Sequence, residues 1–366
     1  MEQTILLHDA VALLKEMVRI PSLSFEEKAV CSHISSKLDS WGIPHVVRRN
    51  NIIAVNRFFD PSRKTLAMDA HMDTVPVNNG YTRDPFEPGE DDSIIYGLGS
   101  NDDGGSVVSM TAAFRHFYDR QLPFNLMLIL SCEEERSGED GTRWLFGEDG
   151  YFANGGEYPM PDWVIVGEPT GLRAASSERG LLVIDGEAHG VSGHAARGEG
   201  VNALYIALED IQTLKNHVFD RHSPIMGDVK LNVTQIHAGT AHNVIPDLCS
   251  FVVDIRPTEQ YSNTEILEEL QAVCSSTLKA RNLTNRSSAT RQDSPLLKAA
   301  QNLGIETFSS PTTSDWMRIG CDAMKIGPGE SSRSHKADEF IMTQEIADAI
   351  GTYIKIIDTF YGNTLE

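Results

Sequence analysis

Cysteine is scarce in this 366-residue sequence, and its placement follows no pattern. The five cysteines are scattered singly, without a CxxC pair or the even-numbered framework typical of small secreted proteins. Long apolar runs are also missing, because the longest fall well short of the ~18 residues that a membrane span requires. The opening MEQTILLHDAVALLKEM has no basic leader before an apolar stretch. We therefore expect a cytoplasmic protein with no membrane partner.

Basic residues are too few to balance the acidic ones. The sequence has 31 lysines and arginines against 52 aspartates and glutamates, a formal net charge of −21, and no Lys/Arg-rich run. Such a chain repels phosphate backbones, so we expect no nucleic-acid partner. The patterns GxGxxG and GxxxxGK[ST] are absent as well, which argues against a nucleotide-binding loop.

What the sequence does contain is the pattern of an α/β protein. Its length suggests two domains, and a hydrophobic content of 40% is sufficient for a core. Several apolar runs are too short for helices and lead into Gly, Pro or polar residues. These runs are NIIAV, TLAMDA, NLMLIL, DWVIVG and DAMKIG. We interpret them as buried, largely parallel strands.

Two helices accompany these strands. The stretch SFEEKAVCSHISSKLDSWGI opens with Ser24 and Glu27 at the spacing of a capping box and continues at helical period to Gly42. After Met342, isoleucines and a tyrosine recur at helical spacing. This pattern predicts a terminal helix packed on the sheet.

Between residues 175 and 286 the pattern changes. The stretches GLLVIDGEAHG, VKLNVTQIHAG and CSFVVDIRP alternate as half-exposed strands do, and GVNALYIALEDIQTLKNHV and SNTEILEELQAVCSSTLKAR have helical periodicity. The order β-α-β-β-α is that of a small α+β unit. Because the buried-strand pattern resumes afterwards, we interpret this unit as an insertion.

Acidic and imidazole side chains stand where the buried strands end. They are His71, Asp73, Glu133, Glu134, Glu135, Glu168 and His335. Ligands of an open α/β sheet bind beyond the carboxyl ends of its strands, so we expect these side chains to converge. Carboxylates crowded there would raise one another's pKa unless cations neutralised them. The donors suit Zn²⁺, and Co²⁺ or Mn²⁺ would also fit, whereas Mg²⁺ suits histidine less well. The set is large enough for two ions.

The order of the motifs resembles that of a known family. The loop YGLGSNDDGG alone indicates no more than a turn around Asp102 and Asp103. Together, DAHMDTVPV, GLGSNDDGG, SCEEERSG, VGEPT, SGHAA, HNVIPD, VDIR, TTSDW and GPGESSRSHKADE are similar to the two-zinc aminoacylase/carboxypeptidase family. The resemblance covers nearly the whole chain. It implies an α/β catalytic domain of zinc-exopeptidase type with a mainly parallel sheet, residues 1–174 and 287–366, and an inserted ferredoxin-like lid and dimerisation domain, residues 175–286.

The same resemblance implies a ligand set for two metal ions. His71 and Glu168 would complete one ion and Glu135 and His335 the other. Asp102 would bridge both ions. The family also has a cis peptide after its bridging acid, which here is the bond between Asp102 and the next residue.

The roles of the remaining acids differ. Asp73 lies on the same side of an extended chain as His71 and is expected to accept the imidazole N–H. Neighbours in an extended segment point to opposite sides, so Glu134 and Glu135 should not share a role. The resemblance makes Glu134 the general base, which takes a proton from the attacking water and passes it to the leaving nitrogen. Many relatives carry Lys where this chain has Gly104, which removes a positive charge near the site.

Substrate contacts follow from the resemblance alone. His194 of GVSGHAARGEG would reach the active site of the opposite subunit of a homodimer and polarise the scissile carbonyl. Asn243 is a second carbonyl donor, and Arg256 would hold a substrate carboxylate. The loop SSPTTSDWMRIG would face the substrate with Thr313, Ser314 and Asp315. The alternative for each of these residues is an ordinary structural role.

Within the family, the sequence looks most like the acetylornithine deacetylase branch. This resemblance implies release of L-ornithine and acetate from N-alpha-acetyl-L-ornithine, a small-molecule substrate, in arginine biosynthesis. N-succinyl-ornithine or succinyl-diaminopimelate desuccinylation, or a dipeptidase or carboxypeptidase activity, would use the same ligands, because acyl choice depends on pocket shape. A metal-free binding protein on the same fold is the non-enzymatic alternative.

Overall fold

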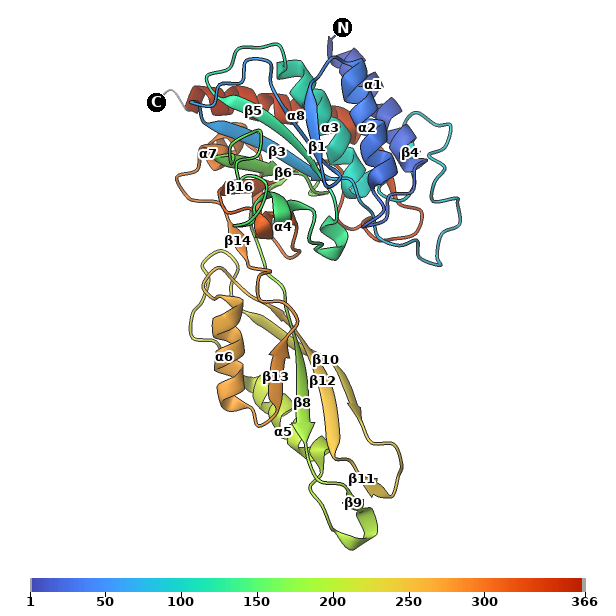
Figure 1. The fold of residues 1–366 in the computed structure, drawn as a ribbon, viewed down its shortest axis with the longest axis vertical. Helices are drawn as coiled ribbons and strands as arrows, with labels where there is room; N and C mark the ends of the chain where they lie inside the picture. The colour runs from blue at the N-terminus through green and yellow to red at the C-terminus, as the bar shows by residue number, and fades with distance from the viewer. Residues whose placement is uncertain (1, 364–366) are drawn as a thin grey trace. The chain divides into compact units, whose positions relative to one another are not determined.

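The central sheet contains the strands that the sequence predicts and several that it does not. In the computed structural model, which describes residues 2–363, the strand order is β1-β2-β5-β3-β6-β16-β7-β14, and β15 pairs with β7 (Figure 1). The strands are β1 (His45–Arg48), β2 (Asn51–Val55), β3 (Thr65–His71), β5 (Asn125–Ser131), β6 (Trp163–Val166), β7 (Ala174–Glu178), β14 (Ser288–Ala289), β15 (Thr307–Ser310) and β16 (Asp322–Lys325). The predicted apolar runs form β2, β3, β5, β6 and β16.

The expectation of a mainly parallel sheet is confirmed for the five predicted strands, with one exception. Strand β3 runs parallel to β5 and to β6, and β6 runs parallel to β16. Strand β2 is antiparallel to β5, with Ile52 opposite Leu130. An apolar run records burial on both faces of a sheet but not the direction of the strand, so the sequence pattern did not reveal this exception.

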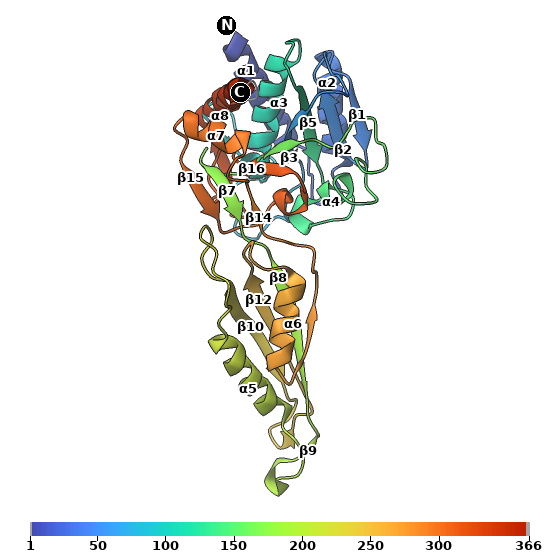
Figure 2. The same ribbon diagram turned by 90° about the vertical axis from the view of Figure 1, so that its left-hand side faces the viewer.

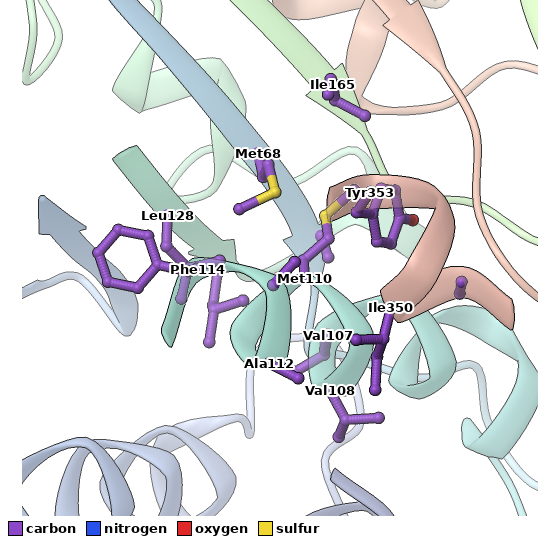
Figure 3. Packing of buried hydrophobic residues seen from close by; sticks show 14 of the residues in the cluster. Met68, Val107, Val108, Met110, Ala112, Phe114, Leu128, Ile165, Ile350 and Tyr353 are labelled. Atoms are coloured by element: carbon purple, nitrogen blue, oxygen red, sulfur yellow. The ribbon is translucent and has the colours of Figure 1, made fainter. Parts of the chain in front are cut away.

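Helices α3 and α8 share one hydrophobic cluster with the sheet. The helices of this part of the chain are α1 (Glu2–Val18), α2 (Lys28–Ser40), α3 (Gly105–Phe117), α4 (Thr142–Leu145), α7 (Pro295–Asn302) and α8 (Thr343–Asn363). Figure 3 shows Met110 of α3 and Tyr353 of α8 beside Met68 of β3. The predicted terminal helix is confirmed by α8, whose isoleucines are buried. Across residues 2–363, no helix is both long and apolar enough to cross a membrane.

The capping box predicted for α2 is wrong. The helix begins at Lys28, and the preceding Glu27 makes no side-chain capping bond. The Ser24 hydroxyl instead donates to Asp73 Oδ2 at 2.7 Å. Glu27 Oε1 accepts from the backbone N–H groups of Phe25 and Glu133, at 2.8 and 3.1 Å. Both polar side chains therefore bind segments near the strand exits, a long-range contact that local spacing does not reveal.

The chain divides into two compact units. The first runs from the N-terminal helix to Ser176, resumes over Thr290–Phe308 and continues from Ser314. The second comprises Ser177–Ala289 and Ser309–Thr313. The role of the second unit as a lid or dimerisation domain stays a prediction.

The second unit has the α+β order expected from its sequence, extended by one strand. Its sheet has the order β10-β12-β8-β13 and is antiparallel throughout (Figure 1; Figure 2 shows the same unit turned by 90°). Its elements are β8 (Leu182–His189), α5 (Ala203–Asn216), β10 (Lys230–Ala238), β12 (Leu248–Arg256), α6 (Asn263–Val273) and β13 (Thr277–Ala280). Helix α6 begins with a capping box of Ser262 and Glu265.

Two small ribbons complete the fold. Strand β4 (Ile94–Tyr96) pairs with β17 (Phe340–Met342), and β9 (Gly193–His194) pairs with β11 (Val244–Ile245). The first ribbon matters for the site because β4 leads into the turn η1 (Ser100–Gly104) and β17 follows the loop that carries His335. The short 3-10 turn η2 (Glu134–Arg136) follows β5.

Candidate metal centre

The candidate ligands come from the ends of separate strands. His71 is the last residue of β3, and Glu135 lies in the turn η2 after β5. Asp102 lies in η1, Glu168 lies two residues beyond β6, and His335 follows β16 by way of a glycine-containing loop. The carboxyl ends of parallel strands meet at one edge of a sheet, which is why distant parts of the sequence supply neighbouring side chains.

Asp102 lies between the two imidazoles. Its Oδ1 is 3.3 Å from His71 Nε2, and its Oδ2 is 3.7 Å from His335 Nε2. Glu135 Oε1 is 2.9 Å from His335 Nε2. Ligand atoms of His71, Asp102 and Glu135 all lie within 4.8 Å of one another, so these groups could hold a metal ion. Glu168 is linked to them by its electrostatic interaction with Asp102.

The buried acids at this edge repel one another. Burial raises the pKa of Glu134 well above its usual range, and repulsion from Glu168 adds to this, against the attraction of His71. Burial and repulsion from Asp102 likewise raise the pKa of Glu168. Divalent cations would relieve this crowding, and imidazole with carboxylate is a donor set that such ions accept. The residues present therefore fit a metal centre.

The orientation of His71 is fixed by the backbone. Its Nδ1 is 3.0 Å from the main-chain oxygen of Asp73, which can only accept, so Nδ1 carries the proton and Nε2 faces Asp102. Although burial opposes protonation, interactions with the carboxylates of Asp102 and Asp73 raise the pKa of His71. Asp73 therefore lies beside His71, as predicted for an orienting residue. Its carbonyl makes the closer contact with Nδ1, since its carboxylate Oδ1 lies 3.5 Å from that atom.

The Asp73 carboxylate has a second task that the sequence did not reveal. Its Oδ1 accepts from the N–H of Glu134 at 3.0 Å, and its Oδ2 accepts from the N–H of Glu135 at 3.1 Å. The segment that they hold is a 3-10 turn, so the assumption of an extended chain is wrong. The two glutamates nevertheless have different surroundings, because Glu135 contacts His335 whereas the Glu134 carboxyl interacts with Glu168 and Asp315.

The loop that carries Asp102 has the backbone feature implied by the resemblance. The peptide bond between Asp102 and Asp103 is cis. A Cβ atom added to Gly104 would lie 2.4 Å from the carbonyl oxygen of Gly99 and 2.7 Å from Leu14 Cδ1. Helix α1 and the loop itself thus occupy the space that a larger side chain needs, which accounts for glycine at this position.

The three residues of the predicted substrate loop are largely engaged within the protein. Asp315 is buried, and its carboxylate accepts from the hydroxyls of Ser131, at 3.0 Å, and Thr142. Burial raises the pKa of Asp315 to about 6. Ser314 Oγ accepts from the N–H of Trp316 at 3.3 Å, and Thr313, half-buried, belongs to the second unit. Asp315 therefore stabilises the loop after β5 rather than offering its carboxylate to solvent.

The candidate substrate-binding residues of the second unit lie at two separate positions. His194, in β9, is exposed, and its Nδ1 accepts from the N–H of Ala196 at 3.2 Å. The carbonyl of Asn243 accepts from Ala195 N–H at 3.0 Å, so His194 and Asn243 lie on adjoining segments. Arg256 donates to both carboxylate oxygens of Asp254, at 2.9 and 3.1 Å. A substrate carboxylate would compete with that ion pair.

Comparisons with known proteins identify the family of this chain. The profile of the peptidase family M20/M25/M40 matches residues 67–359. The chain belongs to this family. It is 26% identical over 384 residues to an acetylornithine deacetylase of Edwardsiella ictaluri, an alignment that covers 96% of this chain and 97% of that one. The resemblance stated from the motifs is thereby confirmed, and the chain is a metal-dependent hydrolase acting on amides.

Solved structures show the same fold. An M20 family metallo-carboxypeptidase from Sulfolobus solfataricus aligns with a TM-score of 0.74 at 16% identity, covering 96% of this chain and 99% of that chain. The YXEP protein of Bacillus subtilis, described as a dinuclear metal-binding peptidase, aligns with a TM-score of 0.68 at 15% identity, covering 97% and 98%. At these identities the likeness concerns the fold, and it confirms the predicted fold class.

Proposed function

We propose that the chain removes the acyl group from N-alpha-acyl amino acids, with N-alpha-acetyl-L-ornithine as its substrate in arginine biosynthesis. The products would be L-ornithine and acetate. The nearly full-length similarity to an acetylornithine deacetylase supports this substrate. The scattered free cysteines fit a reducing cytoplasm as the place of the reaction.

The position of Asp102 carries the proposal. Its two oxygens face different imidazoles, which supports the proposal that one carboxylate serves two ions. We assign His71 and Glu168 to one ion, Glu135 and His335 to the other, and Asp102 to both. Zn²⁺ is the ion proposed, and Co²⁺ or Mn²⁺ would satisfy the same donors. When bound, such ions polarise the amide carbonyl and lower the pKa of water.

Glu134 is proposed as the group that moves the proton. It accepts a proton from the attacking water and donates it to the leaving nitrogen, so that the C–N bond breaks as acid and amine form. Burial raises the pKa of its carboxyl. A base must be ionised at neutral pH, so this role requires positive charge nearby, as the proposed centre supplies.

The second unit is proposed to form a homodimer. Tyr205 and Leu208 of α5 are 64% and 48% exposed, and Ile236 of the edge strand β10 is 42% exposed. An edge strand beside an apolar helix face suits pairing with a second copy. In such a dimer His194 and Asn243 would polarise the substrate carbonyl and Arg256 would bind its carboxylate. Analytical ultracentrifugation tests the proposed homodimer. Tyr205→Glu together with Leu208→Glu should give monomers, and an unchanged dimer would contradict the proposed interface.

A substrate panel tests the activity. The substrates are N-alpha-acetyl-ornithine, N-alpha-succinyl-ornithine, succinyl-diaminopimelate and simple dipeptides, each assayed on protein of measured metal content. We expect the highest kcat/KM with acetyl-ornithine. A preference for either succinyl compound or for dipeptides would transfer the assignment to that alternative, which similar folds among peptidases make reasonable. Hydrolysis of none of them by metal-loaded protein would refute the proposed activity.

A further inference from the structure

Two loops that carry candidate ligands hold each other through buried side chains. One loop, residues 97–104, bears Asp102, and the other, residues 327–339, bears His335. Glu339 is 2% exposed, and its Oε1 accepts from the N–H groups of Asn101 and Asp102, each at 2.9 Å. Its Oε2 accepts from the N–H of Gly99 at 3.2 Å. A single carboxylate from the second loop therefore binds the backbone of the first loop at Asp102 and its neighbours.

Asn101 makes the return contact. Its side chain is buried, and its Oδ1 accepts from the N–H of Glu330 at 2.9 Å. Its Nδ2 donates to the carbonyl of Glu330 at 3.2 Å and to Ser334 Oγ at 3.4 Å. A Cβ atom on Gly329 would lie 2.3 Å from Asn101 Oδ1, so the second loop approaches this amide as closely as glycine permits. Ser334 directly precedes His335 in the sequence.

We propose that Asn101 and Glu339 are positioning residues that set the spacing between Asp102 and His335, and through it the affinity for the ion that these ligands share. This inference rests on the two-ion centre proposed above. Metal ligands depend on the groups that orient them, and loss of such a group typically lowers metal affinity about 10–100-fold. Glu339 acts on the first loop through the backbone N–H groups that it binds, and Asn101 acts on the second loop through the backbone of Glu330 and the hydroxyl of Ser334.

The ribbon of β4 and β17 pairs only as far as Gly97, so side chains are needed to hold the turn that follows. The carbonyl of Glu339 accepts from Gly97 N–H at 2.8 Å, and strand β17 continues the pairing with β4. Beyond Gly97 the ladder stops, and the backbone turns through η1. The backbone N–H groups of this turn would otherwise lack partners from a strand, and Glu339 satisfies several of them. The ribbon thus brings the loops together, and the two side chains fix where their ligands lie.

Matched variants separate position from charge. Glu339→Asp keeps the carboxyl group but shortens the side chain, so it loses reach to the turn. Asn101→Leu changes no charge but removes every bond of the amide. Asp338→Asn is the control. Asp338 directly precedes Glu339, but its carboxylate accepts from Thr82 N–H, Thr82 Oγ1 and Arg83 N–H at 2.9, 2.6 and 3.1 Å, and these partners lie on a loop that carries no candidate ligand.

The experiment titrates the full metal-free chain with Co²⁺, followed by absorption spectroscopy and calorimetry. Wild type should bind two ions per chain. Glu339→Asp and Asn101→Leu should each bind one ion about 10–100-fold more weakly, while the other ion and the Asp338→Asn control stay within about threefold of wild type. Circular dichroism shows whether each variant folds. If one of them does not fold, the ion affinity of the other variant tests the inference.

Three results would overturn the inference. If both folded variants bind two ions as tightly as wild type, or if the control loses as much affinity as they do, Asn101 and Glu339 are not positioning residues, and the proposed centre is unaffected. If wild type itself binds fewer than two ions, the two-ion centre fails, and the inference fails with it.

Discussion

The two units of this protein bury their acids for different purposes. In the first unit Asp69, Asp73, Asp102, Asp103 and Glu339 are all buried, and they gather around the carboxyl ends of parallel strands. Burial raises the pKa of Asp103 and raises that of Glu339 to about 8, so the folded chain alone does not favour their ionised forms. Such a cluster gains stability when cations bind to it.

In the second unit, a buried acid is stabilised by hydrogen-bond donors and not by cations. Its buried Asp210 accepts from the N–H groups of Ser275 and Ser276, at 2.9 and 2.7 Å, and from the Ser276 hydroxyl, so this carboxylate has partners from its own unit. At the surface, Asp185 pairs with Arg281 at 2.7 Å. A buried acid such as Asp210, surrounded by donors, stabilises its fold, whereas buried acids that crowd one another indicate a binding site, even where some of them, such as Asp73, also accept backbone hydrogen bonds.

The largest expected effect is on catalysis in the first unit. Glu134→Gln should lower kcat by about 10²–10⁴-fold, the usual contribution of a general base, while leaving metal content unchanged. Glu139→Gln, on an exposed neighbour, is the control and should retain activity. The measurement is steady-state kinetics beside metal analysis, and turnover near wild type in the Glu134 variant would refute the assigned base.

Metal removal should destabilise the first unit alone. Ions present at a thousand times their Kd stabilise the folded state by about 4 kcal/mol, and this is lost on chelation. Hydrogen exchange should therefore quicken in β5 and η2 and stay unchanged in β8. Addition of Zn²⁺ should restore the original rates. Equal changes in both units, or none in either, would remove the proposed difference between them.

The reverse experiment targets the second unit. Asp210→Asn replaces a charged acceptor of several hydrogen bonds, which should cost about 1–3 kcal/mol of unfolding free energy. Ion binding in the first unit should be unaffected. Asp220→Asn, at an exposed position of the same unit, provides the control. Urea denaturation measures the effect, and a loss of metal affinity in the Asp210 variant would show that the units are not independent.

The smallest effect concerns the pH dependence of the metal-free protein. Burial raises the pKa of Asp315 to about 6, so between pH 4 and 6 the folded state holds a proton that the unfolded chain releases. The contribution of this group to stability is thus present at low pH and is lost as pH rises to about 6. Asp315→Asn should flatten that decline in denaturation curves measured with chelator. An unchanged slope would assign the pH dependence to other groups.

Much of the fold was predictable because its signals are local. The apolar runs NIIAV, TLAMDA, NLMLIL, DWVIVG and DAMKIG all form strands, and helical spacing after Met342 located α8. Strand exits indicated where His71, Glu135 and Glu168 would be found. Edge strands such as β14 were missed, because two residues carry no periodicity.

The supporting contacts were not predictable, because they join residues far apart in sequence. Ser24 and Glu27 have the spacing of a helix cap, but they bind the loops beyond β3 and β5 instead. Asn101 and Glu339 lie beside predicted ligands, yet nothing in their local sequence indicates that they contact each other's loops. Only the fold shows these partners.

Anomalous X-ray diffraction from crystals grown with Zn²⁺ would show directly whether Asp102 binds two ions. We predict two zinc peaks, one bound to Asp102 Oδ1 and His71 Nε2 and the other to Asp102 Oδ2 and His335 Nε2, with bonds of about 2.0–2.2 Å. A single peak, or zinc that leaves either oxygen of Asp102 without a metal, would contradict it.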